Sequence, residues 1–505
     1  MAKMMCCCLT RRKSAKIIVL ALALIVLVIT ILPQNTVAAE DREVINASEI
    51  LGNITRGETV KIENADIRGD LDITEWRKDL DEIEVNGIPR RVVESEISIR
   101  NSKIEGTVNF NPIYFNNTVE FENVIFEGGV SFFYATFDKR TNFQDSTFKS
   151  SAKFDKATFN DIAYFNRVNF MDVRFRNATF NNATWFGFST VHGEYAVFDN
   201  TFFNKSAFFT SFTVTGYTQC INVTFNDSVD FRWASFGRTV IFRKTTFNES
   251  ADFLWVTFDG QVSFDDAVFK APVNFVQATF SDTTSFQNAH FYDTANFILA
   301  RFKDRTYFTD AVFNDSVDFS EADIFQTMKI NWSQLDGKLV YNDYFYQSLL
   351  RNFETLGQSE DWQDAYYEYH VEKRKHLPLL GFRRPLERVF LDSSCGYGVR
   401  PLKTIRGAFI VIGLFAVLYR LIEEKESVQR LGEHSLKDKI NNCWRRLWKF
   451  IFLSVSIFTT LGILNNRKSA ENRKTWFRFF VIIEVFLGWI IMTLFVISLT
   501  LTWIR

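Results

Sequence analysis

Residues 225–269 read FNDSVDFRWASFGRTVIFRKTTFNESADFLWVTFDGQVSFDDAVF, and this stretch decides the fold. Its phenylalanines follow one another at alternating steps of six and five residues, so the pattern repeats every eleven. An α-helix brings together residues three, four or seven apart and cannot give this alternation. A flat antiparallel sheet would need hairpin signals such as Asn-Gly between its strands, and these are almost absent. The pattern predicts a mostly β fold in which short strands coil into a solenoid.

The repeated unit is a small or β-branched residue two positions before each phenylalanine, as in Ala251 before Phe253. Residues two apart on a strand point to the same face, so both side chains are expected to face the interior. The polar residues that follow are expected to turn the corner. The unit also runs from Phe121 to Phe170 and from Phe275 to Phe325.

The register of the repeat can be followed through its irregular stretches. Val214 and Cys220 stand where two phenylalanines are missing, so we expect Cys220 to be a core thiol. The spacing between successive inward residues is one residue too short within 170–175, and one extra residue within 191–198 restores the register. Residues 74–96 are predicted to form an inserted loop. Upstream, isoleucine takes the place of phenylalanine at the same spacing, at Ile62, Ile67, Ile73, Ile99 and Ile104.

These repeated motifs resemble the pentapeptide-repeat family, which implies a right-handed, four-sided (quadrilateral) β-helix with two inward residues on every side. We assign residues 40–336 to this solenoid, with the insertion at 74–96. The extra residue on alternate sides departs from the family pattern and predicts coils of 22 residues instead of 20. About ten coils at ~4.8 Å each would form a rod about 45–50 Å long.

The N-terminal residues 1–39 are predicted to be a signal peptide or an uncleaved signal anchor. Basic residues precede an uncharged apolar run over 17–32, and small residues follow near Ala39. The following chain is therefore expected to be exported. Asn-x-Ser/Thr sequons occur only before position 332, which suits exported glycosylation sites, although Asn also suits solenoid corners. The candidates are Asn46, Asn53, Asn116, Asn177, Asn182, Asn204, Asn222, Asn226, Asn248, Asn314 and Asn331.

The composition gives no sign of an enzyme, a cofactor or a metal site. The net charge of −1 gives no global reason to expect a nucleic-acid partner. The 56 phenylalanines against 7 prolines and 22 glycines are explained by the repeat. The five histidines never stand at metal-ligand spacing, and no catalytic constellation lies outside the corner residues. We therefore expect no catalytic residues, no metal and no cofactor.

Residues 337–404 are predicted to be a helical cap and connector. An open solenoid end leaves unpaired strand edges, so a cap is expected. One apolar helical stripe includes Phe345 and Phe353 and ends at Gly357, and a second includes Trp362 and Tyr369. A basic cluster follows, which either meets anionic lipid headgroups or forms a solvated helix face. Its residues are Lys373, Arg374, Lys375, Arg383, Arg384 and Arg388.

Residues 405–505 are predicted to be a transmembrane domain. Helices are expected at about 405–422 and 479–504, because both stretches are apolar and long enough to cross a bilayer. Between them, 447–465 is an apolar segment of borderline length. Glu484 is the only charged residue within the second helix, which makes this membrane carboxylate a functional candidate.

The order of long helix, short segment and long helix resembles the pore domain of potassium-channel-like proteins, with 447–465 as a re-entrant pore helix and filter. The resemblance implies a selectivity filter at Thr459, Thr460, Leu461 and Gly462, and an inner-helix hinge at Gly488. It also implies a homo-tetramer that conducts a monovalent cation. The sequence then continues with Ile463, Leu464 and Asn465 where the family has an aromatic residue, a second glycine and an acid, so the filter is degenerate.

Two functions are consistent with these patterns. The first is a multi-pass cell-membrane protein whose extracytoplasmic solenoid is attached to a tetrameric cation channel. The second is a surface interaction or adhesion module that the C-terminal helices merely anchor.

An external rod would make the re-entrant segment enter the membrane from the cytosol, inverted relative to ordinary potassium channels. The basic residues that border this segment favour a cytosolic connector. A full third crossing at 450–466 would instead exclude the filter interpretation.

Overall fold

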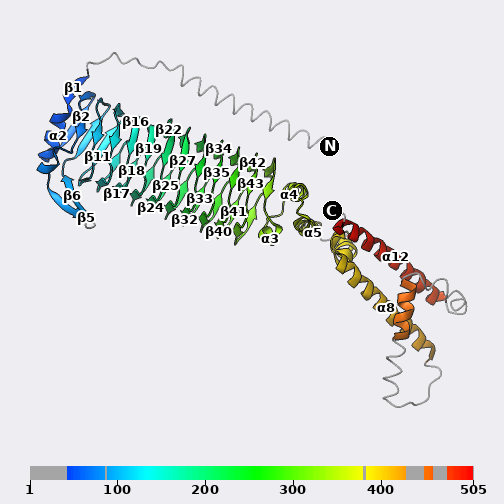
Figure 1. Ribbon diagram of the computed structural model, residues 1–505. Coiled ribbons are helices and arrows are strands. Elements are labelled where there is room, and N and C mark those ends of the chain that lie inside the picture. Colours follow the sequence, from blue (N-terminus) through cyan, green and yellow to red (C-terminus); the bar gives the residue numbers. More distant parts are fainter. Residues whose placement is uncertain (1–41, 86–87, 379–382, 428–447, 459–474, 504–505) are drawn as a thin grey trace.

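The computed structural model describes residues 42–85, 88–378, 383–427, 448–458 and 475–503. A β-solenoid extends from the N-terminal side, and helices follow it (Figure 1). Strand β1 (Glu43–Asn46) and helix α2 (Ala47–Thr55) begin the solenoid. The predicted signal segment at 1–39 lies outside the described residues.

Each turn of the solenoid contains four short strands. In the middle of the rod these are β30 (Ser235–Phe236), β31 (Val240–Ile241), β32 (Thr246–Phe247) and β33 (Ala251–Asp252), after which β34 (Thr257–Phe258) begins the next turn. Every strand pairs in parallel with its equivalent in the neighbouring turns. The four-sided β-helix is thus confirmed.

The four faces are grouped into three sheets. One 12-stranded sheet runs from β2 (Val60–Glu63) to β45 (Val317–Asp318), and another from β5 (Glu82–Val85) to β44 (Val312–Phe313). The other two faces form one 23-stranded sheet, because two longer strands turn the corner between them without a break. These strands are β16 (Thr147–Lys153) and β19 (Asn169–Arg174). The solenoid has about 13 turns, so the expected number of ten was too low, and its length is roughly 60 Å at ~4.8 Å per turn.

The register confirms the 22-residue coil. Phe225 pairs with Phe247, Phe247 with Phe269, and so on along the rod. One turn has 21 residues and the next has 23, since Phe159 pairs with Phe180 and Phe180 with Phe203. The shortened step and the regained residue therefore lie where the spacing of the phenylalanines predicted them.

The inserted segment is partly a strand pair instead of a loop. Val60 pairs with Ile97, 37 positions later instead of 22. Within 74–96, β5 pairs in an antiparallel hairpin with β6 (Ile88–Val93). The second half of β6 also pairs in parallel with β10 (Ile113–Phe115), so this part of the segment belongs to the solenoid wall. The single sequence could not show this, because a hairpin strand and a wall strand have the same alternation of side chains.

The interior is a set of stacked phenyl rings. Phe264, for example, lies parallel to Phe242 at a centroid distance of 4.9 Å and to Phe286 at 5.0 Å. Each such ring is fully buried, and its burial stabilises the folded state by about 2 kcal/mol. Cys220 lies in the same core, where burial raises the pKa of its thiol well above the usual value. It is the core residue that the register predicted.

Three helices close the far end of the rod: α3 (Trp332–Leu335), α4 (Asp343–Leu356) and α5 (Ser359–Lys375). Phe345 of α4 continues the internal stack, since its ring lies 4.7 Å from that of Phe319. Asn352 both accepts from the backbone N–H of Met328 and donates to its carbonyl, which satisfies a strand edge. Gly357 ends α4 in the left-handed conformation, with φ 68°.

The connector consists of short helical pieces before two long helices. These pieces are α6 (Arg383–Glu387), a π-helical turn (Arg388–Asp392), α7 (Ser393–Cys395) and a 3-10 turn (Gly396–Gly398). Helices α8 (Pro401–Ser427) and α12 (Thr475–Trp503) follow. Among the described residues, Pro401–Leu421 and Phe479–Thr500 are the two helical stretches long and apolar enough to cross a membrane.

Between α8 and α12 lies a short apolar helix, Trp448–Phe458, drawn in orange in Figure 1. The described part of this helix spans about 16 Å, and a hydrocarbon core is about 30 Å thick. Phe450 and Ile457 of this helix pack with Phe415 and Tyr419 of α8 in one apolar cluster.

Candidate functional site

Glu484 lies in the middle of α12 and is completely buried. Its Oε2 accepts a hydrogen bond of 2.5 Å from the Tyr419 hydroxyl of α8. Its Oε1 forms a hydrogen bond with the Ser454 hydroxyl of the short helix. One carboxyl group therefore joins all three helices at one point, which explains why a charged residue is tolerated in an apolar helix.

Ser454 also anchors the short helix to α8. Its hydroxyl lies 3.0 Å from the carbonyl oxygen of Ile412, in addition to its contact with Glu484. A serine hydroxyl has a single hydrogen to donate, so it cannot donate to the carbonyl and to the carboxyl at the same time. Ser454 therefore donates to one of these two oxygens while its hydroxyl lies close to both.

Gly488 lies one turn beyond Glu484 and allows a close helix contact. A Cβ atom at this position would lie 2.4 Å from the carbonyl oxygen of Phe458, the last residue of the short helix. Helix α12 continues through Gly488 to Trp503. The structure assigns this glycine a packing role, and its role as a hinge stays a prediction.

The predicted filter Thr459, Thr460, Leu461 and Gly462 lies outside the described residues, as does Asn465. The described part of the short helix reaches Phe458, directly before this segment. The Phe458 carbonyl oxygen lies close to Gly488 of α12.

A second polar cluster joins the rod to helix α8, the first of the two long apolar helices. Asp392 of the connector accepts from Arg374 of α5 at 2.8 Å and from Lys403 of α8 at 2.9 Å. The Tyr367 hydroxyl also donates to it, at 2.8 Å. Burial would raise the pKa of Asp392, but the hydrogen bonds from Lys403, Tyr367 and Arg374 outweigh it and hold the pKa below the usual value. We call these four residues the Asp392 clamp.

The clamp changes the interpretation of the basic cluster in the connector. Arg374 is largely covered and forms hydrogen bonds with Asp392 and Tyr397, so neither a lipid contact nor a solvated face describes it. Lys373 pairs with Asp343 of α4, and Arg383 pairs with Glu387. The sequence could not distinguish these roles, because the acidic partners are up to 30 positions away.

The sequon asparagines lie mainly at solenoid corners. Asn204, Asn226 and Asn248 belong to a ladder in which each side-chain amide donates to the asparagine one turn earlier. Asn177 and Asn222 have positive φ angles of 56° and 58°, a conformation that asparagine tolerates. Fold geometry therefore accounts for much of the asparagine bias.

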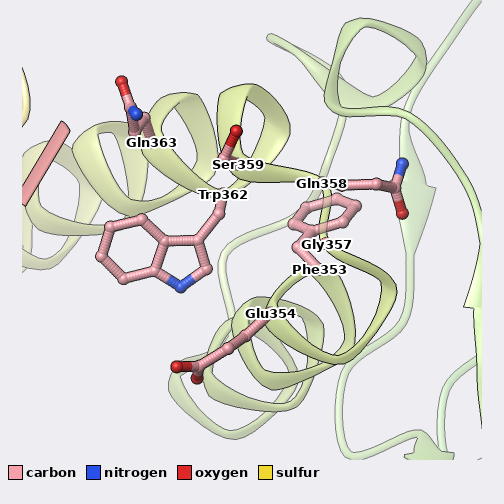
Figure 2. Close-up of a pocket in the computed structure, with 7 residues that line it drawn as sticks. All are labelled: Phe353, Glu354, Gly357, Gln358, Ser359, Trp362 and Gln363. Atoms are coloured by element: carbon pink, nitrogen blue, oxygen red, sulfur yellow. The ribbon is translucent and has the colours of Figure 1, made fainter. Parts of the chain in front are cut away.

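A small hollow lies between α4 and α5 (Figure 2). It has a volume of about 120 Å³, and the rings of Phe353 and Trp362 form part of its lining. Binding pockets for small molecules are usually several hundred Å³. This hollow is therefore not developed as a site. Within the described parts of the chain, no group of three or more potential ligands could hold a metal ion.

Comparisons with known proteins recognise only the rod. Residues 143–190 and 256–301 match the family described as "Pentapeptide repeats (9 copies)". No curated protein and no solved structure matches the chain. The matched stretches of the solenoid are thus similar to pentapeptide repeats, and the match does not include α8 or α12.

Proposed function

We propose that the chain is a multi-pass cell-membrane protein in which an exported solenoid is coupled to a channel-like pore domain. One observation carries the proposal: a short apolar helix, described over Trp448–Phe458, is held against the two helices that are long enough to cross a membrane by the buried carboxyl of Glu484. This arrangement suits a re-entrant pore helix that presents the next residues, Thr459–Gly462, to an ion path. The proposed cargo is a monovalent cation, and the protein is proposed not to be an enzyme.

A pore of this kind needs several copies of the chain. Each chain supplies a single pore segment, so four copies would surround one path. Large apolar side chains on α8 and α12 are available for contacts with lipid or with other copies. Phe409 and Leu414 of α8 and Ile482 and Phe486 of α12 are each at least 60% exposed. We therefore propose a homo-tetramer in membrane lipid.

Further features belong to the same proposal. The coil is proposed to be right-handed, because parallel crossovers are overwhelmingly right-handed. The N-terminal segment is proposed to be a signal that places the rod outside the cytoplasm, where its free sequons would be glycosylated. The Asp392 clamp supports coupling, since a force on the rod would reach α8 through it.

Planar-bilayer recording of the purified full chain tests the channel. We expect a cation current that changes in ion selectivity or amplitude in Thr460→Ala, because a threonine oxygen would be lost from the path. The matched control is Thr500→Ala near the end of α12, whose hydroxyl bonds its own helix at the Val496 carbonyl. No current under any condition, or a current identical in all three proteins, would refute the channel.

The second candidate is a surface-interaction module anchored by its C-terminal helices. It is favoured by exposed aromatic side chains on the rod, such as Phe188, Trp233 and Trp255, which the interior does not use. Accessibility of single cysteines at Asn288→Cys on the rod and at Asn465→Cys tests the topology on which the channel depends. The channel in its inverted form requires the two sites on opposite sides of the membrane, and two sites on the same side would leave only the anchored module.

A further inference from the structure

One edge of the solenoid carries a column of exposed apolar residues. Phe188, Trp233, Trp255 and Leu299 occupy equivalent corner positions in different turns and are 65%, 51%, 50% and 43% exposed. Backbone hydrogen bonds join the successive corners, for example from Trp233 N–H to the Leu254 carbonyl and from Trp255 N–H to the Val276 carbonyl. Five steps of ~4.8 Å make this column about 24 Å long. We call the four residues the aromatic ridge.

The backbone at the ridge is poorly suited to these residues. All four have φ between 57° and 60°, the left-handed region that disfavours bulky side chains. The other left-handed corner of the rod carries asparagine, aspartate or lysine at most of its positions, including Asn200, Asn222, Lys244, Asp266 and Asn288. Since the same backbone turn is made there without aromatic rings, the fold does not require them. Strained residues that the fold does not require point to function.

The ridge is bordered by a column of carboxylates and amides. These side chains stand on the outer surface of the adjoining sheet, three positions before the corner, from the Trp233 turn onward. In the two preceding turns Trp185 and Phe208 occupy this position. Asp252 accepts from the Asn274 amide at 2.9 Å, and Asp230 is paired with Arg232, whose guanidinium lies over Trp233. The column is Asp230, Asp252, Asn274, Asn296 and Asp318.

We propose that the ridge and its border bind a neutral polysaccharide. A pyranose ring has an apolar face of C–H groups and a rim of hydroxyls, so it fits an aromatic surface bordered by carboxylates and amides. A linear polymer would contact several turns of the rod at once, which adds weak contacts into useful affinity. The proposal does not depend on whether the membrane helices conduct ions.

The charge of the border argues against other occupants. An anionic lipid surface attracts basic residues, and three of the five bordering side chains are aspartates. A second copy docked ridge to ridge would bring two such aspartate columns together. For the same reason we expect the polymer to be uncharged and not a polyuronic acid.

Depletion assays with the full chain in lipid nanodiscs test this inference. The probes are insoluble cellulose and chitin, with immobilised polygalacturonate as the charged comparison. We expect retention on at least one neutral polymer, and roughly tenfold weaker retention after Trp233→Asn together with Trp255→Asn. Asparagine suits the left-handed turn, so this double variant should keep the fold.

The matched control is Tyr292→Ala, which removes an equally exposed ring, 51% exposed, outside the ridge. It should bind like the unaltered protein. The inference is overturned if neither neutral polymer retains the protein, if the double variant binds equally well, or if polygalacturonate is preferred. It is also overturned if the double variant instead loses binding to added anionic vesicles, or loses self-association in sedimentation, with no change on the polymers.

Discussion

The rod and the C-terminal apolar helices are stabilised in opposite ways. In the rod, inward apolar residues recur in every turn, and most phenylalanine rings stack on rings in the neighbouring turns, as Phe264 does. In the C-terminal part, one carboxyl group, two hydroxyls and one glycine set the position of the short helix. Stability in the rod is therefore distributed over many residues, whereas the arrangement of the apolar helices depends on a few.

This contrast explains why family comparison recognises only the rod. A repeated apolar unit leaves a repeated sequence signal, and the matched stretches 143–190 and 256–301 both lie in the repeat of inward phenylalanines. A contact such as that between Ser454 and Glu484 leaves no periodic trace.

The largest expected effect tests the rod itself. Phe264→Ala removes a ring with no exposed surface and leaves a cavity between Phe242 and Phe286. We expect the free energy of unfolding to fall by about 3–5 kcal/mol. The lowered denaturant midpoint of the β-sheet circular-dichroism signal measures it. Phe325→Ala, whose ring is 62% exposed, is the control and should have little effect.

Substitutions at Glu484 test the few-contact arrangement of the C-terminal part. Glu484→Leu leaves the Tyr419 and Ser454 hydroxyls buried without this partner, at a cost of about 1–3 kcal/mol. We expect faster hydrogen exchange in the helix Trp448–Phe458 and none of this change in the rod. Glu484→Gln keeps a side chain that can form both hydrogen bonds. In this variant the backbone amides of the helix Trp448–Phe458 should exchange more slowly than in the leucine variant. Equal exchange in both variants would contradict the role of the carboxyl group.

The Asp392 clamp joins the two regions, and its loss should separate them. Asp392→Asn removes the charge that pairs with Arg374 and Lys403, which are partly exposed, so we expect a local cost of about 1–2 kcal/mol. The rate of proteolytic cleavage between α5 and α8 measures this local loss of stability and should increase. Lys375→Gln, which removes only an exposed pair with Glu372, is the control.

The clamp should also respond to acid. Because the pKa of Asp392 is held below its usual 3.8, its contribution to stability is complete above that value. It is lost as the pH falls through the lower pKa of the folded state. Proteolysis at this site should therefore accelerate below about pH 4 in the unaltered protein, and the Asp392→Asn variant should lack this acid-dependent step.

The smallest expected effect is a gain of stability. Trp255→Asn places a residue that tolerates φ 60° at a corner where tryptophan is strained. We expect the rod to gain about 1 kcal/mol, measured by the same circular-dichroism midpoint. A loss of stability would show that the Trp255 side chain packs against the rod and stabilises it.

The sequence determined the solenoid almost completely. The alternating five-residue and six-residue steps fixed which side chains face inward, the 22-residue coil, the shifted turns and the place of Cys220 in the core, because inward packing recurs with the strand period. The helices α4 and α5 followed from their apolar stripes and from Gly357.

Only the tertiary structure decided the contacts between distant segments. Tyr419 and Glu484 are 65 positions apart, and Asp392 meets α5 and α8 across a connector whose sequence has no periodicity. A polar residue in an apolar run, such as Ser454, is a signal that a partner exists, but it does not say which one. Pairing of this kind depends on how helices pack in three dimensions, whereas the rod repeats one local rule along its length.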